Sequence, residues 1–597
     1  MILQAVDWGF VVGFFILSLA IGLAVSRKAG RSSSEFFLSG RNMPWWLLGI
    51  SMVATTFSSD TPNLVTDIVR QNGVAGNWVW WAFLLTGMLT VFVYAKLWRR
   101  SNVLTDVEFY ELRYSGKAAA FLRGFRALYL GVFFNVLIMA TVSLAIIKIG
   151  GVMFNLTPIQ ILLIASLVTV IYSALGGLRG VLITDFFQFA IAMVGSIGAA
   201  IVVLRLPQVG GFGALLANEN VVSKLNLLPD FSNTEALLAL FILPLAVQWW
   251  SVWYPGAEPG GGGYIVQRML SAKSEKHAVG ATLLFNAAHY ALRPWPWIIV
   301  ALCSLVVFPD LGSLRAAFPH VDPSVLGHDL AYPAMLTFLP HGLLGLVVAS
   351  LIAAFMSTIS THLNWGSSYV VNDFYKRFIN PEASEKRQVL VGRLSTVGLM
   401  ILAGLIALVL SNALQAFNIL LQIGAGTGLL FILRWFWWRI NPYSEITAMV
   451  VSFVVAVYLQ LIHPRTGLPE ISTPVRLAVG VGITTICWIT VTLLTKPTES
   501  KTLRSFYRLV QPGGPGWKRV IDKAKQEGEL LEEAKQAWDV PTGILCMVLG
   551  CFAVYSALFA TGYWIYGRRT IANILTVIAV VSTFVLTKAW KRLRLAS

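Results

Sequence analysis

The chain has 597 residues, of which 56% are hydrophobic and only 12% are charged, and its mean hydropathy is +0.71. These values exclude an ordinary water-soluble domain, in which about 25% of residues are charged. The formal net charge of +17 could indicate nucleic-acid binding, but most basic residues fall on the predicted inner side of a membrane, so no nucleic-acid partner is expected.

Fifteen apolar runs of roughly 20 residues recur along the chain, each long enough to cross about 30 Å of hydrocarbon. The first run follows a segment without Lys or Arg, so we expect a retained span rather than a cleaved signal peptide. With the N-terminus outside, the odd number of spans predicts a cytoplasmic C-terminus and a multi-pass protein of the plasma (inner) membrane. The runs begin near residues 7, 46, 77, 125, 157, 182, 236, 278, 333, 388, 413, 443, 474, 541 and 571.

The second run, WWLLGISMVATTFSSDTPNLVTDIV, is interrupted by polar residues between Thr55 and Thr61, and Pro62 follows them. A helix break inside the hydrocarbon must have its backbone groups satisfied by protein, water or ions, because lipid offers no hydrogen bonds. This run therefore predicts a binding site. The alternative is that the hydroxyl groups only support helix packing.

The seventh run, PLAVQWWSVWYPGAEPGGGGYIVQ, contains Pro255, Pro259 and the glycines 260–263. It lies five spans after the second run and crosses the membrane in the opposite direction. Two interrupted spans in corresponding positions predict an inverted repeat with a binding site near the bilayer midplane. The alternative is that the glycines form a flexible loop at the cytoplasmic face.

Charged residues within spans are functional candidates because they are costly in lipid. Asp60 lies at the break of the second run, and Arg293 lies in the eighth run with His289 four residues earlier on the same helical face. Arg293 could bind a carboxylate of a solute, or it could form a structural ion pair with Asp60 or Glu258. Tryptophans near the breaks could stack on a solute ring or belong to the membrane-interface belt; these are Trp80, Trp81, Trp249, Trp250 and Trp253.

The ninth run carries adjacent hydroxyl groups on Ser357 and Thr358. A sodium ion prefers about five or six oxygen ligands, which hydroxyls and the carbonyls of a helix break can supply together. Taken alone, such hydroxyls more often bond the carbonyl four residues back.

The segment 496–540 lies in a predicted cytoplasmic loop. It runs through GGPG into the charged sequence WKRVIDKAKQEGELLEEAKQ, which predicts an amphipathic helix at the protein or membrane surface.

Several motifs in order resemble the sodium:solute symporter family, which includes sugar, proline and pantothenate carriers. They are SSEFFLSGRNMPWWLLGISM, YSALGGLRGVLITDFFQ, YIVQRMLSAKSEKHA, AAFMSTIS and VVNDFYKRF. The resemblance implies an all-α polytopic membrane protein with a LeuT-like 5+5 inverted repeat, one extra N-terminal and about four extra C-terminal transmembrane helices. We expect an N-terminal helix and cytoplasmic loop (1–44), a first repeat (45–205), a second repeat (206–440) and C-terminal accessory helices (441–597).

The same resemblance implies that sodium, as the coupling ion, binds the carbonyls of Ala54, Phe57 and Ala354 and the hydroxyls of Ser357 and Thr358. The family commonly places a serine pair at the last two positions, and threonine keeps the hydroxyl.

Asp185 resembles the family's aspartate on the inner sodium route. Its alternative role is the N-cap of the sixth span, for which Thr184 competes.

For the solute, Tyr254 resembles the aromatic inner gate of sugar-carrying members, Thr61 falls where those members use glutamine, and Ser251 falls at their sugar-contacting asparagine. The departure at Ser251, together with the extra glycines of the seventh run, counts against a sugar. The predicted solute residues are Asp60, Thr61, Trp250, Ser251, Tyr254, Glu258, His289 and Arg293, and the solute is a sugar, amino acid, carboxylate or nucleoside.

The sequence thus predicts a sodium-coupled secondary active symporter that imports a small polar organic solute across the lipid bilayer by alternating access. The alternative is a solute sensor or channel on the same scaffold, although no ring of repeated charges indicates a pore. An enzyme is not expected, because the seven histidines include no HExxH and no GxSxG accompanies them.

Overall fold

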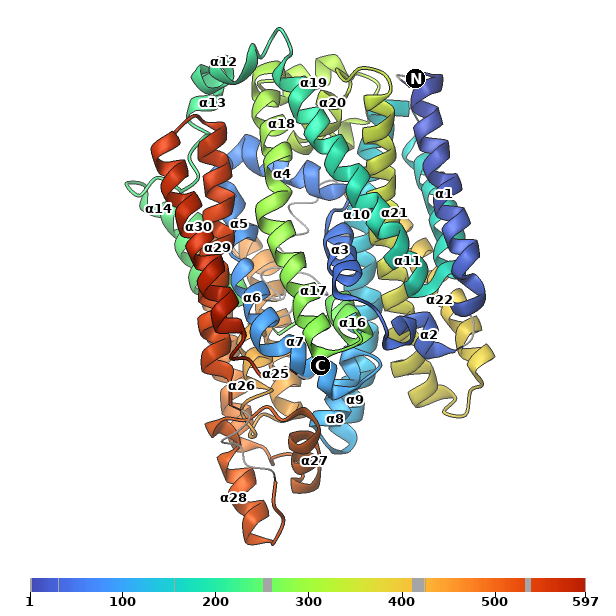
Figure 1. Ribbon diagram of the computed structural model, residues 1–597, viewed down its shortest axis with the longest axis vertical. Coiled ribbons are helices and arrows are strands. Elements are labelled where there is room, and N and C mark those ends of the chain that lie inside the picture. The colour runs from blue at the N-terminus through green and yellow to red at the C-terminus, as the bar shows by residue number, and fades with distance from the viewer. Residues whose placement is uncertain are drawn as a thin grey trace.

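The computed structural model describes residues 3–29, 32–154, 156–250, 260–410, 424, 426–531 and 538–595. Every extended regular element in these ranges is a helix (Figure 1). The α-helices of the N-terminal half are α1 (Ala5–Ala29), α2 (Ser33–Leu38), α3 (Trp45–Thr56), α4 (Asp60–Asn72), α5 (Trp78–Trp81), α6 (Leu84–Leu89), α7 (Ala95–Ser101), α8 (Phe109–Arg113), α9 (Gly116–Leu128), α10 (Asn135–Phe154), α11 (Pro158–Leu204), α12 (Gly211–Ala217), α13 (Glu219–Val222), α14 (Thr234–Leu237), α15 (Leu243–Ala246), α16 (Gly263–Ser271) and α17 (Glu275–Ala287).

The α-helices of the C-terminal half are α18 (Pro294–Val307), α19 (Leu311–Ala317), α20 (Ala331–Leu336), α21 (Leu343–Ser368), α22 (Glu385–Ala407), α24 (Gly428–Leu433), α25 (Pro442–Val457), α26 (Thr473–Leu494), α27 (Ser500–Val510), α28 (Lys518–Gln526), α29 (Val540–Ile565) and α30 (Arg569–Trp590). Several continue into short turns of π-helix, including Ala288–Leu292 (η8) after α17 and Tyr369–Ile379 (η11) after α21.

Eleven helices in the described ranges are long and apolar enough to cross a membrane, and three shorter apolar helices accompany them. They agree with fourteen of the predicted runs. The run predicted to begin near residue 413 starts on 411–423, outside the described residues, and its described end is α24.

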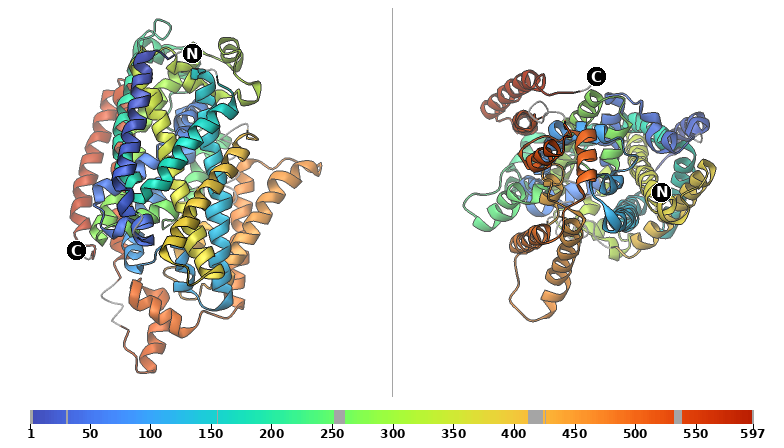
Figure 2. Two further views of the ribbon diagram at one scale, coloured as in Figure 1. Left: turned by 90° about the vertical axis from the view of Figure 1, so that its right-hand side faces the viewer. Right: turned by 90° about the horizontal axis from the view of Figure 1, so that it is seen from below.

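The helices run approximately along the long axis of the molecule, with the N-terminus at one end and α27 and α28 at the other (Figure 1). In the span that contains α21, 83% of the most apolar stretch is buried, compared with 22% in α1 and 17% in α30. The helix α21 is therefore central, whereas α1 and α30 present apolar side chains outward, as expected of helices that meet lipid. The hairpins α25–α26 and α29–α30 lie at the periphery (Figure 2).

The helix α11 contains the predicted fifth and sixth spans. Gly177 separates its two parts with a non-helical φ of 53° and ψ of −167°. Glycine populates positive φ at little cost, so the chain can change direction here between the two helical parts.

Both predicted helix breaks are present. α3 ends at Thr56, Phe57 departs from helical geometry with φ −89° and ψ 77°, and α4 begins at Asp60. In the seventh run, the glycines 260–262 lie outside any helix directly before α16 begins at Gly263, and residues 251–259 fall outside the described residues.

The glycine run after the second break is held against α7 and the two short helical segments that flank it, η3 (Thr90–Tyr94) and η4 (Asp106–Glu108). The φ angles of Gly260 and Gly261 are +85° and +87°. A Cβ atom at Gly260 would lie 3.1 Å from the ring of Tyr94. The Trp98 indole N–H donates to the Gly260 carbonyl at 2.6 Å, and Asp106 accepts from the Gly263 amide at 2.7 Å. Glycine is therefore required for backbone conformation and for close approach.

The described part of the segment 496–540 contains α27 and α28, and α28 is shorter than the amphipathic helix predicted after GGPG. α28 ends at Gln526, because Gly528 adopts a φ of +77° that an α-helix cannot continue. The carboxylate of Glu529 then turns back to accept from Arg504 at 2.5 Å. Residues 532–537 of the predicted helix lie outside the described residues.

This segment packs onto the helical body. The ring of Phe506 on α27 stacks with Trp517 at 5.6 Å. The guanidinium of Arg113 lies 4.9 Å from the centre of the Trp517 ring and donates from Nε to the Arg434 carbonyl at 3.0 Å. Arg113 is fully buried, so the segment is anchored to α8 and to the end of α24.

Candidate functional site

The hydroxyl-bearing face of α21 meets the last turn of α3. Thr358 Oγ1 donates to the backbone carbonyl of Thr55 at 2.8 Å, and the hydroxyls of Thr55 and Thr361 lie 3.3 Å apart. The side chains of all three residues are fully buried. The predicted approach of these two helices is therefore present.

The end of α3 leaves carbonyl groups outside the regular helical pattern. The amide of Phe57 donates to both the Val53 and Ala54 carbonyls, at 2.9 and 3.0 Å. In an α-helix the Phe57 carbonyl would accept from the amide of Thr61, but that amide donates to the Ser58 carbonyl at 3.2 Å. The break thus presents the Phe57 carbonyl outside the helical ladder.

Thr61 supports the break itself. Its hydroxyl accepts from the Ser58 amide and donates to the Thr56 carbonyl, both at 3.3 Å. Its predicted role was solute contact, and in the structure its hydroxyl is engaged with the backbone between α3 and α4.

Ala354, Ser357 and Thr358 lie within one turn of α21 and are buried. The Ser357 hydroxyl donates to Asp185 Oδ1 at 2.5 Å, whereas the Thr358 hydroxyl faces the break. The two adjacent hydroxyls thus have different partners in this state of the protein.

Asp185 is not a helix N-cap, and that alternative is wrong. It lies within the second part of α11, well after Gly177, and its Oδ2 accepts from the Ser51 hydroxyl at 2.5 Å. Thr184 is no cap either, because its hydroxyl donates to the Gly180 carbonyl of its own helix at 3.0 Å.

A buried arginine completes this cluster, and sequence reasoning missed it. Arg268 on α16 lies with Nη2 3.9 Å from Asp185 Oδ2 and 2.9 Å from the Thr361 hydroxyl. Its Nε donates to the Ser51 hydroxyl at 3.2 Å. Arg268 is fully buried, so its charge and that of Asp185 compensate each other away from solvent. The available signal was a cation in the motif YIVQRML, directly after a broken span.

His289 and Arg293 form a second polar cluster on the other side of α3. Arg293 Nη2 lies 2.6 Å from His289 Nδ1, which confirms that the two share a helical face. Arg293 Nη1 donates to the Thr56 hydroxyl at 3.2 Å, and an attractive charge interaction reaches Asp60. The guanidinium also lies 5.3 Å from the centre of the Trp297 ring.

Aromatic rings form a wall beside this second cluster. The ring of Trp80 stacks with Tyr290 at 5.9 Å and meets His289 edge-on at 5.7 Å. The Trp80 indole N–H donates to Asn77 Oδ1 at 2.8 Å. Trp80 is therefore held in place beside the His289–Arg293 pair.

The remaining predicted solute residues lie elsewhere or outside the described chain. Trp250 packs with Val247 against Leu477 and Val481 of α26. The predicted positions Ser251, Tyr254 and Glu258 fall on 251–259, outside the described residues.

Comparisons with known proteins agree on one family. The model of the sodium:solute symporter family matches residues 36–452. The sodium/glucose cotransporter of Vibrio parahaemolyticus is 27% identical over 468 residues, which are 75% of this chain and 83% of that protein. The sodium/myo-inositol cotransporter of Bos taurus is 29% identical over 566 residues, which are 84% of this chain and 75% of that protein.

A solved structure shows the same fold. A Na⁺-coupled sialic acid symporter, in a substrate-bound outward-open state, aligns with a TM-score of 0.64 at 20% identity and covers 83% of this chain and 99% of its own.

Proposed function

The chain belongs to the sodium:solute symporter family, and we propose that its coupling sodium binds where the break after α3 meets the hydroxyl face of α21. As a family member it is a sodium-coupled symporter of a small solute with a LeuT-like fold, and not an enzyme.

One observation carries the sodium site: the Thr358 hydroxyl already bridges to the Thr55 carbonyl at 2.8 Å across the two helices. A sodium ion between them would take oxygens from the carbonyls of Ala54, Phe57 and Ala354 and from the hydroxyls of Ser357 and Thr358. A site of neutral oxygens binds a monovalent cation reversibly, because it lacks the strong attraction of a carboxylate cage.

Asp185 serves the exit of sodium in this proposal. It accepts the Ser357 hydroxyl at 2.5 Å, so it lies one side chain away from the proposed ligands. An ion leaving the site would meet its carboxylate next, and the buried Arg268 at 3.9 Å limits how tightly that carboxylate holds a cation.

The solute binds beside sodium, against His289, Arg293 and Trp80. Arg293 donates to Thr56, the last residue of α3, so the solute cluster and the proposed sodium site share one helix end. Sodium would order that end, and the solute would raise sodium affinity by the same factor as sodium raises solute affinity. The guanidinium suits a solute with hydroxyl or carboxylate oxygens.

The proposed orientation places the N-terminus outside and the C-terminus in the cytoplasm of the plasma (inner) membrane, with repeats at 45–205 and 206–440. The excess of basic residues on the predicted inner side supports this orientation through the positive-inside rule. Ser251, Tyr254 and Glu258 stay predictions for the solute side.

A thermal-unfolding screen of the purified protein tests the solute proposal. Polyols, carboxylates, amino acids and nucleosides are each added with sodium and, separately, with potassium. A bound solute at a hundredfold excess over its Kd stabilises by about 2.7 kcal/mol, and we expect this stabilisation only with sodium. An equal stabilisation in potassium would contradict the coupling.

Equilibrium binding of radioactive sodium tests the ion site. Ser357→Ala should weaken sodium binding. Ser350→Ala is the matched control, because Ser350 is buried on the same helix and its hydroxyl donates to Val347 within that helix at 2.7 Å. Equal sodium affinity in wild type and Ser357→Ala would exclude the assigned hydroxyl.

A further inference from the structure

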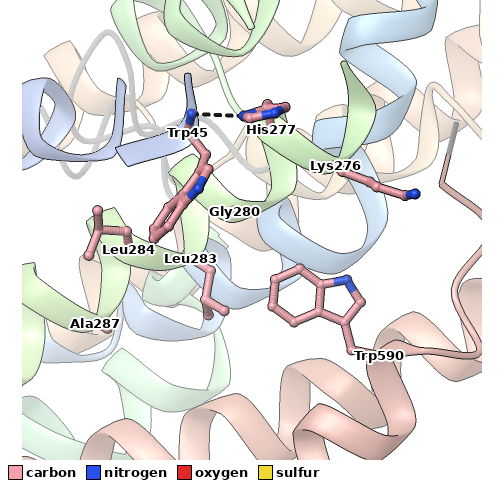
Figure 3. Close-up of a pocket in the computed structure, with 8 residues that line it drawn as sticks. All are labelled: Trp45, Lys276, His277, Gly280, Leu283, Leu284, Ala287 and Trp590. Carbon is pink, nitrogen blue, oxygen red and sulfur yellow. Dashed lines mark hydrogen bonds between the residues drawn. The ribbon is translucent and has the colours of Figure 1, made fainter. Parts of the chain in front are cut away.

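A groove on the outer surface of the bundle lies apart from the ion and solute residues. It has a volume of about 570 Å³ and is walled by α3, α17 and the end of α30. We call it the α17 groove. Figure 3 shows its lining residues, which are Trp45, Lys276, His277, Gly280, Leu283, Leu284, Ala287 and Trp590.

The α17 groove is apolar along its length and polar at one end. Its lining on α17 runs from Lys276 through Gly280 to Ala287, which at 1.5 Å per residue is about 16 Å. One leaflet of hydrocarbon is about 15 Å thick. The groove therefore has the length of one acyl chain within a leaflet.

Gly280 keeps the groove open. A Cβ atom at this position would lie 3.3 Å from Cβ of Trp45, so a larger side chain would fill the space between α17 and α3. On the opposite side Trp590 faces Leu283 (Figure 3). Tryptophan is favoured where a membrane protein meets the interface between headgroups and hydrocarbon.

The polar end carries an excess of positive charge. Lys276 is exposed, as are Lys273 on the preceding loop and Lys591 and Arg592 directly after α30. The Arg594 carbonyl accepts from Arg100 at 3.3 Å, which holds the tail after α30 beside the start of α17.

The acidic side chains close to this end are already neutralised. Glu275 accepts two hydrogen bonds from Arg100, at 2.8 and 3.0 Å. Asp539 pairs with Lys96 and accepts from the Arg594 amide at 3.2 Å. In the described part of the chain, no carboxylate lies within ion-pair distance of Lys276.

We propose that the α17 groove binds an anionic phospholipid, with one acyl chain along α17 and the phosphate group facing Lys276. A zwitterionic lipid would gain little from the net positive rim, and a small soluble anion would leave the apolar length of the groove unused. The proposed lipid site is separate from the sites used for symport, because none of its lining residues belongs to the proposed sodium or solute sites.

The lipid would touch the helix that ends at the proposed sodium site. Trp45 is the first residue of α3, and its amide donates to His277 Nδ1 on α17 at 3.0 Å. The groove thus joins the start of α3 to α17, whose continuation through η8 carries His289 and leads to Arg293.

Native mass spectrometry of the purified protein tests the proposal by counting bound phosphatidylglycerol and phosphatidylcholine. We expect retention of one phosphatidylglycerol and much weaker retention of phosphatidylcholine. Lys276→Gln should weaken phosphatidylglycerol binding about fivefold, the factor that one lysine contributes at an anionic membrane surface.

Lys386→Gln is the matched control. Lys386 is exposed and, like Lys276, is the second residue of a helix that begins with Glu directly after a Ser N-cap. Gly280→Leu should abolish retention by filling the groove while the rim charges stay. Thermal unfolding with inorganic phosphate alone distinguishes a lipid site from a phosphate site, and we expect no stabilisation.

Three results would overturn the proposal. They are equal retention of the two lipids, equal weakening by Lys276→Gln and Lys386→Gln, and phosphatidylglycerol retention by a folded Gly280→Leu variant at the wild-type level.

Discussion

Thr358→Val offers the sharpest test of the proposed sodium site. The Thr358 side chain is 0% exposed and its hydroxyl donates to the Thr55 carbonyl at 2.8 Å. Without sodium, the change leaves a buried carbonyl without this donor, which costs about 1–3 kcal/mol of unfolding free energy. With sodium bound, the change also removes an oxygen ligand of the ion. If that ligand contributes as much as a hydrogen bond to a charged group, the free energy of sodium binding becomes weaker by about 1.5–3 kcal/mol. The sodium Kd then rises about 10- to 150-fold.

The assay is a sodium titration of thermal unfolding in which potassium keeps the ionic strength constant. The midpoint sodium concentration should rise for Thr358→Val and stay near wild type for Thr358→Ser, which keeps a hydroxyl. Thr396→Val controls for buried threonines in general, because the Thr396 hydroxyl donates to Gly392 within α22 at 2.9 Å. The assignment of Thr358 to the sodium site is refuted if Thr358→Val leaves the midpoint unchanged, or if Thr396→Val moves it as far.

Further outcomes are expected at three other places. Asp185→Asn removes the carboxylate 3.9 Å from the buried Arg268, so the free energy of unfolding should fall by about 3–5 kcal/mol. An unchanged denaturation profile would argue against a stabilising ion pair. Burial opposes ionisation of Glu111, but hydrogen bonds and charge attraction from two arginines outweigh it and lower its pKa. Its stabilising effect is therefore present above the unfolded pKa and is lost as the pH falls through the lowered pKa of the folded state. Glu111→Gln should make the melting temperature fall less steeply at acid pH. An unchanged fall in the variant would contradict a stabilising role of the Glu111 carboxylate. Gly261→Ala forces an alanine to a φ of +87° and should lower the free energy of unfolding by about 1–2 kcal/mol. Gly262 has a φ of −159°, so it should tolerate alanine. Equal losses of unfolding free energy in the two variants, measured by chemical denaturation, would show that backbone strain is not the cause.

Hydropathy and helix breakers account for most of what could be predicted of the fold. The spans follow from apolar length, and the break between Thr56 and Asp60 follows from polar residues inside such a span. The helix end at Gln526 was missed, because the charged pattern continues past Gly528 and only the backbone shows that the glycine turns the chain.

The site was partly predictable for a different reason. Thr358 and the break lie about 300 residues apart in sequence, and only the resemblance to a family indicated that they meet. Arg268 was missed because a lone cation in a short helix gives no sign of its partners, which come from α3, α11 and α21. Trp250 packs on α26, a contact that its position beside a helix break could not indicate.

The position of Arg268 bears on how firmly the helices around the proposed sodium site are held together. Its guanidinium touches side chains from α3, α11 and α21 at once. If α3 and α21 moved apart, this buried cation would lose part of its neighbours, at a cost of several kcal/mol. Arg268 therefore ties three helices together, and one buried charge opposes their separation.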